Sequence, residues 1–75
     1  MAKASKQLVI CLDNSGYESS LERRKIYVAL RDGVAESHGQ IRVVDESGED
    51  YLYARERFVA VELPLSTRRA VLHAA

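Results

Sequence analysis

Apolar and polar residues alternate along residues 41–63, and this alternation predicts how the second half of the chain folds. Ile41 and Val43 lie on either side of Arg42, and Leu52 lies between two tyrosines. A period of two is typical of a β-strand with one buried face. We therefore expect two strands in this region, with Leu52 facing the core and its tyrosine neighbours facing outward.

The polar stretch between these strands, residues 45–50, has the composition of a tight turn. Gly48 can adopt the positive φ that a hairpin turn requires, and the nearby aspartate and serine side chains can bond to the turn backbone. Residues 54–57 lack β-branched side chains and predict a single helical turn. Strand character returns at residues 58–63 and ends at Pro64.

The first half of the chain begins with an apolar run at residues 8–12, which predicts a strand that ends in a turn. The next stretch, residues 17–30, has two interpretations. Read as a helix, it is capped by a serine near its start. Read as a loop followed by a strand, it forms that strand over residues 25–30. We favour the loop and strand, because the alternation there is cleaner than the helical stripe.

Two short helices are expected beside the sheet. Asp32 is placed to cap a helix over residues 34–37, and Gly39 is placed to end it in a left-handed turn. Near the end of the chain, residues 66–74 predict a C-terminal helix with Ser66 as its N-cap.

Chain length limits the architecture that these elements can build. The 75 residues, 47% of them hydrophobic, indicate a single domain over residues 1–75, with residues 1–6 as a flexible tail. Too little chain remains for a layer of long helices. We therefore predict a mostly β fold: a small SH3-like antiparallel barrel of about five strands with a short C-terminal helix. Because so small a domain has a limited core, a weak homodimer is the alternative to a monomer.

Charge and cysteine content exclude several classes of function. Eleven basic residues balance eleven acidic ones, so no overall field draws the protein to nucleic acid or to an anionic membrane. Cys11 is the single cysteine, which favours a reducing compartment and a buried, apolar role for its thiol. No apolar run approaches membrane-spanning length, and the first residues lack the apolar core of a secretion signal. We expect a cytoplasmic location and no membrane partner.

The polar residues form no arrangement typical of an enzyme or a metal site. Four carboxylates lie within residues 45–50, but their spacing is not that of a helix–loop–helix calcium site, and we interpret them as a solvated hairpin tip. His38 and His73 have no second cysteine to complete a zinc site. No nucleophile–base order or glycine-rich phosphate loop is recognisable. We therefore expect no enzymatic activity, no cofactor and no metal.

The residues best suited to binding are aromatic and basic, and they gather around the second strand of the predicted hairpin. Tyrosine rings offer a large contact area at low entropic cost, and guanidinium groups bind carboxylates or phosphates. We expect a binding face made of Tyr51, Tyr53, Arg42, Arg55 and Arg57. The predicted function is a non-enzymatic binding or adaptor module for a protein partner. The alternative is an RNA- or DNA-binding module that uses the same face, although nearby acidic residues cancel part of its field.

Several strings in the chain resemble a family of small uncharacterised bacterial proteins. The most specific is DESGEDYLY, within residues 41–53, and shorter ones lie at residues 11–18, 20–22 and 25–27. The resemblance covers residues 8–63. Members often have proline where this chain has Ala54, which would stiffen the one-turn helix. The resemblance implies a bacterial source and a compact β domain, and it brings no established activity whose residues could be carried over.

Overall fold

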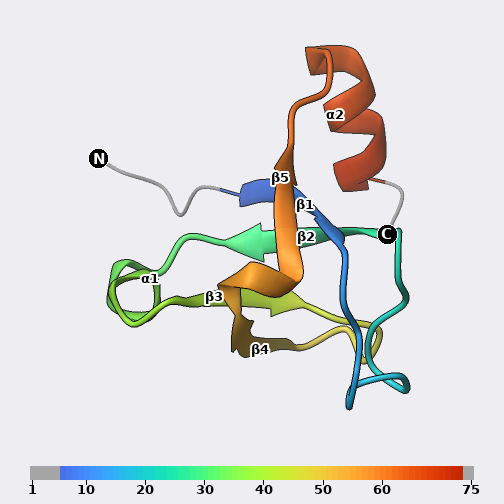
Figure 1. The fold of residues 1–75 in the computed structure, drawn as a ribbon. Helices are drawn as coiled ribbons and strands as arrows, with labels where there is room; N and C mark the ends of the chain where they lie inside the picture. The colour runs from blue at the N-terminus through green and yellow to red at the C-terminus, as the bar shows by residue number, and fades with distance from the viewer. Residues whose placement is uncertain (1–5, 74–75) are drawn as a thin grey trace.

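A single antiparallel sheet of five strands organises the structure, a computed structural model that describes residues 6–73 (Figure 1). The strands are β1 (Lys6–Cys11), β2 (Ile26–Leu30), β3 (Gln40–Val44), β4 (Asp50–Ala54) and β5 (Phe58–Val61). They lie in the order β4-β3-β2-β1-β5, so β1 pairs with both β2 and β5. The described fold is therefore mostly β, as predicted.

The predicted hairpin and the elements that follow it are confirmed. β3 and β4 pair antiparallel, with Ile41 opposite Tyr53 and Val43 opposite Tyr51. One turn of 3₁₀ helix, η1 (Arg55–Arg57), then carries the chain from β4 to β5 at the other edge of the sheet. Within residues 6–73 no strand pairing joins β4 to β5. The sheet is therefore open, and the closed barrel expected from the sequence is not confirmed.

The main core lies on one face of this sheet, where alternate strand positions carry the buried side chains. These core residues are Val9, Cys11, Tyr27, Ala29, Ile41, Val43, Tyr53 and Phe58, with Leu21 added from the loop between β1 and β2. Burial raises the pKa of the Cys11 thiol, because the charged thiolate would lose its hydration there. Cys11 is thus a buried apolar side chain, as predicted.

The segment between β1 and β2 is a loop, which settles the two interpretations of residues 17–30 in favour of loop and strand. Leu21 is fully buried, and its carbonyl accepts a 3.0 Å hydrogen bond from the Asn14 side-chain amide. The backbone N–H of Arg24 donates to the Cys11 carbonyl at 2.7 Å. The loop is therefore fastened to the sheet at its anchor leucine and again where β2 begins.

The short helix before β3, α1 (Gly33–Ser37), has the predicted ends. The Asp32 side chain accepts a hydrogen bond from the Ala35 backbone N–H at 3.0 Å, and Gly39 adopts a φ of +73°. An N-cap carboxylate satisfies a backbone donor that the helix itself leaves free. His38 lies at the C-cap, and its ring Nδ1 is 2.9 Å from the Val34 carbonyl oxygen.

The C-terminal helix, α2 (Leu65–His73), begins earlier than predicted. The Pro64 carbonyl already accepts from the Arg68 backbone N–H at 2.8 Å, so Ser66 lies inside the first turn and is not the N-cap. Val71 of this helix lines a cavity with Val28 and Val44, which belong to the sheet face away from the main core. Neither helix in the described part of the chain is long and apolar enough to cross a membrane.

The two ends of the chain need one correction. Lys6, which the sequence assigns to a flexible tail, belongs to β1 and lies opposite Leu30 of β2. Its carbonyl also accepts a hydrogen bond from the Arg68 guanidinium of α2. These backbone and side-chain bonds order Lys6. Residues 1–5 of the predicted tail and residue 74 of the predicted helix lie outside the described residues.

Replacing Gly48 with alanine is expected to lower the free energy of unfolding by about 1–2 kcal/mol. Gly48 has a φ of +86°, and no atom lies within 4 Å of the position that a Cβ would take. The loss of stability therefore comes from the backbone conformation alone. Urea unfolding followed by far-UV circular dichroism measures it.

Gly33→Ala is the matched control for this change. Gly33 begins α1, has open space around it and lacks a positive φ. Alanine there is expected to raise the free energy of unfolding by up to about 1 kcal/mol, because it restricts the unfolded chain and favours the helix. Equal losses in both variants would contradict the assignment of the Gly48 cost to its φ.

Candidate functional site

The tyrosines of β4 lie on the side of the strand opposite to the one predicted. Tyr53 is only 5% exposed and belongs to the core, whereas Leu52 is 40% exposed. The reason is the register: Tyr53 lies opposite Ile41, whose side chain faces the core, so Leu52 must face away. Tyr51, on the same side of β4 as Tyr53, extends past the core and is 50% exposed.

Tyr53 can be buried because its hydroxyl has polar partners. The hydroxyl donates a 2.6 Å hydrogen bond to Asp45 Oδ2 and lies 3.2 Å from the Ser20 hydroxyl oxygen. Burial and the hydrogen bond to the Asp45 carboxylate raise the pKa of Tyr53, so the ring stays neutral at physiological pH. A buried phenol without such partners would be strongly destabilising.

The acidic turn is structured, and the prediction of a solvated tip is wrong for its first residue. Asp45 is buried, and besides Tyr53 its carboxylate accepts from the Ser47 N–H at 2.9 Å and the Ser47 hydroxyl at 2.6 Å. Glu46 is also engaged, accepting from Lys25 Nζ and the Tyr27 hydroxyl, each at 2.6 Å. Within residues 6–73, no three or more metal-ligating side chains gather into a site.

A row of three aromatic rings in edge-to-face contact extends from the core to the surface through Tyr53. Its ring meets the Tyr17 ring edge-to-face at a centroid distance of 5.0 Å, and the Phe58 ring at 5.9 Å. The Arg57 guanidinium lies over the outer ring, Tyr17, at 4.7 Å from its centroid. Arg57 is held there by the Asp13 carbonyl, which accepts from its Nη1 at 3.1 Å. Edge-to-face ring contact and cation–π attraction thus fix Tyr17 at the surface.

Tyr17 and Tyr53 border a cavity of about 420 Å³, which we call the tyrosine groove. It lies where β3 ends and β4 begins, beside the loop that carries Tyr17. Its lining consists of Tyr17, Ser20, Asp45, Ser47, Tyr51, Leu52 and Tyr53. Tyr17 and Tyr51 are half-exposed, while Asp45 and Tyr53 form a buried floor. The groove therefore combines exposed aromatic area with a rigid, hydrogen-bonded base.

The structure brings together only part of the predicted binding face. Tyr51 and Tyr53 line the tyrosine groove, and Arg57 lies beside it. Arg42 is opposite Leu52 in the β3–β4 pairing and lies on the other side of the sheet. There it bonds Asp32 at 2.8 Å and Asp50 at 3.0 Å, so its charge is already neutralised.

Arg55 is also separated from the tyrosines, because it follows the far end of β4 and lines a different cavity. Sequence reasoning in turn left Tyr17 out of the predicted site. The sequence feature that could have identified Tyr17 is weak. Tyr17 is an aromatic residue directly after the turn glycine Gly16, in a loop that Leu21 anchors to the core. No pattern in the sequence indicates that this loop folds back over β4.

Comparison of the chain with protein-family models, with curated proteins and with solved structures found no match. The resemblance stated from residues 41–53 therefore stays a prediction. The candidate function rests on the geometry and charge of the tyrosine groove.

Proposed function

We propose that the chain is a small, non-enzymatic SH3-like binding module that holds a segment of a protein partner in the tyrosine groove. The single observation that carries this proposal is the pair of half-exposed rings, Tyr17 and Tyr51, over a groove whose floor is fixed by buried hydrogen bonds. Aromatic side chains on a rigid base bind extended peptides with little loss of side-chain entropy.

The order of the elements supports the SH3-like part of the proposal. A long loop separates β1 from β2, a tight hairpin joins β3 to β4, and η1 links the two edge strands, β4 and β5. A cytoplasmic, bacterial setting belongs to the same proposal. It is supported by the buried lone thiol of Cys11 and by the resemblance to a bacterial family.

Charge around the groove favours a partner segment that carries a basic residue next to an apolar one. Glu49 accepts a 3.1 Å hydrogen bond from the Tyr51 hydroxyl, and Asp13 lies 3.6 Å from Arg57 beside Tyr17. The Glu49 carboxylate thus lies beside the Tyr51 ring, whereas Asp13 is paired with the guanidinium that lies over the Tyr17 ring. Phosphate groups would be repelled by Glu49, so the alternative, a nucleic-acid-binding module, would depend on Arg57 and Arg23, whose charges act on Asp13 at one side of the groove.

Panning a random peptide library against the protein tests the proposal. We expect enriched peptides with lysine or arginine beside aromatic or aliphatic residues, and Tyr51→Ala to weaken their binding about tenfold or more. Tyr51 is exposed, so this variant should keep its fold. Val34→Ala, an apolar truncation at a still more exposed position on α1, is the control and should bind as the wild type does.

A single-stranded oligonucleotide titrated in parallel separates the two classes of partner. We expect no binding of it at physiological salt. Binding that weakens steeply with salt, together with an empty peptide selection, would replace the peptide proposal with the nucleic-acid one. Peptides that bind wild type and Tyr51→Ala equally would show that the tyrosine groove is not their site.

A further inference from the structure

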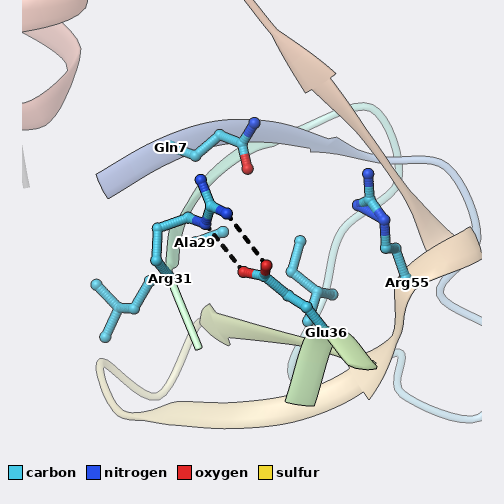
Figure 2. Close-up of a pocket in the computed structure, with 7 residues that line it drawn as sticks. Gln7, Ala29, Arg31, Glu36 and Arg55 are labelled. Carbon is cyan, nitrogen blue, oxygen red and sulfur yellow. Dashed lines mark hydrogen bonds and ion pairs between the residues drawn. The ribbon is translucent and has the colours of Figure 1, made fainter. Parts of the chain in front are cut away.

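A second cavity, of about 270 Å³, lies beside the start of β3, away from the tyrosine groove, and Figure 2 draws the residues that line it. It is bordered by residues from the start of β1 and β3, from the end of β2 and just beyond it, from α1 and from η1, whereas the tyrosine groove lies where β3 ends. Its polar lining consists of Gln7, Arg31, Glu36 and Arg55, and its apolar lining includes the buried Ala29 and Ile41. Both of these apolar residues belong to the main core, so the cavity opens onto the end of that core.

One carboxylate of the protein already lies in this cavity. Glu36 accepts two hydrogen bonds from the Arg31 guanidinium, at 3.0 and 3.2 Å, and one from the Asp32 backbone N–H at 3.2 Å. The two bonds from Arg31 lower the pKa of Glu36, so the pair is ionised at neutral pH. Figure 2 shows this pair on one side of the cavity.

Arg55 lies on the other side of the cavity, and among the described residues its guanidinium has no ion-pair partner. Its backbone N–H donates to the Gly39 carbonyl at 3.0 Å, which fixes the start of η1. Its guanidinium makes no hydrogen bond and no ion pair with any residue in the described range 6–73. Two guanidiniums against one carboxylate leave the cavity with a single positive charge.

We propose that this cavity binds a small monocarboxylate, with the ligand's carboxylate on Arg55 and Gln7 and its apolar body against Ala29 and Ile41. A planar guanidinium presents two parallel N–H donors that match the two oxygens of a carboxylate. Gln7 adds an amide that can donate to the same group. The volume lies just below the usual range for ligand sites, which restricts the ligand to a few heavy atoms beyond its carboxylate.

Glu36 determines the charge of the ligand. Its carboxylate is paired with Arg31 and repels any further negative charge on the ligand. A dianion such as inorganic phosphate is therefore disfavoured. The proposal is independent of the tyrosine groove, because the two cavities share no lining residue.

Titration with benzoate, followed by two-dimensional ¹H–¹⁵N NMR, tests this site. We expect saturable shifts centred on Gln7, Glu36 and Arg55, with affinity near the millimolar range expected for so few ligand atoms. Benzamide, which has the same shape without the charge, and inorganic phosphate should produce no such shifts. Three outcomes would overturn the proposal. Equal binding of benzamide would show that the site is only apolar, and tighter binding of phosphate would show that it is a phosphate site. The third outcome is binding that does not saturate by about 10 mM benzoate.

Two variants of the full chain assign the binding to individual side chains. Arg55→Gln should weaken benzoate binding about tenfold or more, whereas Arg69→Gln, an exposed arginine on α2, should leave it unchanged. Glu36→Gln should strengthen it, because Arg31 becomes free to add a second guanidinium. If Glu36→Gln weakened binding as much as Arg55→Gln, the proposed repulsion between Glu36 and the ligand's carboxylate would be wrong. The NMR spectra themselves report whether each variant is folded.

Discussion

Replacing Leu21 with alanine is expected to lower the free energy of unfolding by about 3 kcal/mol, within the range that buried leucine truncations span. Leu21 is 0% exposed although it lies in a loop. A domain of this size has a total stability on the order of 5–10 kcal/mol, so this one change removes a large share of it. Urea unfolding followed by far-UV circular dichroism gives the difference.

The control for this experiment is Leu65→Ala, the same chemical change at a position on α2 that is mostly exposed. It should alter the free energy of unfolding by no more than about 0.5 kcal/mol. A Leu21→Ala variant as stable as the control would mean that the loop between β1 and β2 does not contribute to the core. The anchoring of this loop by Leu21 would then not explain why Tyr17 lies against Tyr53.

Asp45→Ala is expected to lower the free energy of unfolding by about 3 kcal/mol. The loss comes from buried hydrogen-bond donors that are left without an acceptor, and not from a cavity in the core. The substitution removes the acceptor for the Tyr53 hydroxyl and for both donors of Ser47. The Tyr53 hydroxyl would remain buried with only the Ser20 hydroxyl nearby. Thermal unfolding of Asp45→Ala, Tyr53→Phe and the double variant measures the coupling, which should be about 1–2 kcal/mol.

The same carboxylate makes stability depend on pH. Burial raises the pKa of Asp45, but the hydrogen bonds from Ser47 and Tyr53 outweigh burial, and the pKa in the folded state is lowered. A lowered folded pKa contributes stability above the unfolded value of about 4, and this contribution is lost as pH falls through the folded pKa. Asp45→Ala should therefore flatten the decline of stability in acid.

Glu49→Ala is the matched control for the network, since Glu49 belongs to the same turn and is exposed. Its single hydrogen bond to the Tyr51 hydroxyl should be worth less than about 1 kcal/mol. If Glu49→Ala proved as destabilising as Asp45→Ala, the turn would depend on its overall charge and not on the buried Asp45 bonds.

Local features were predictable from the sequence because they depend on neighbouring residues. The hairpin follows from alternation on both sides of Gly48, and the start of α1 follows from Asp32, whose side chain reaches a backbone N–H three residues away. The strand after the loop could be predicted from its own alternation, whereas the bond from Arg24 to Cys11 that fastens the loop joins residues far apart in sequence. In the hairpin turn and at the helix cap the interacting groups lie within a few residues of one another.

The facing of the tyrosines could not be predicted, because both sides of β4 carry apolar surface. Alternation separates Leu52 from Tyr51 and Tyr53 but does not say which side is buried. The decision depends on Ser20 and Asp45, which supply partners for the Tyr53 hydroxyl. One of them lies in a distant loop, so hydropathy alone assigns the wrong side.

The scattering of the predicted arginines has a geometric cause. Arg42 and the tyrosines are close in the hairpin, but the register places Arg42 opposite Leu52 and therefore on the other side of the sheet. Arg55 lies only two residues beyond Tyr53, yet it follows the end of the strand and reaches the second cavity. Closeness in sequence did not amount to a shared surface.

The pairing of β1 with β5 also determines when the fold can form. β1 is among the first residues of the described chain and β5 is near its end, yet each residue from Leu8 to Cys11 lies opposite a residue of β5. During synthesis the apolar edge of β1 lacks this neighbour until residues 58–61 have left the ribosome. Contacts between residues so far apart in sequence form slowly, and until then the unpaired edge of β1 can pair with other chains. Emergence of β5 therefore marks the point in synthesis at which the chain is no longer exposed to aggregation through β1.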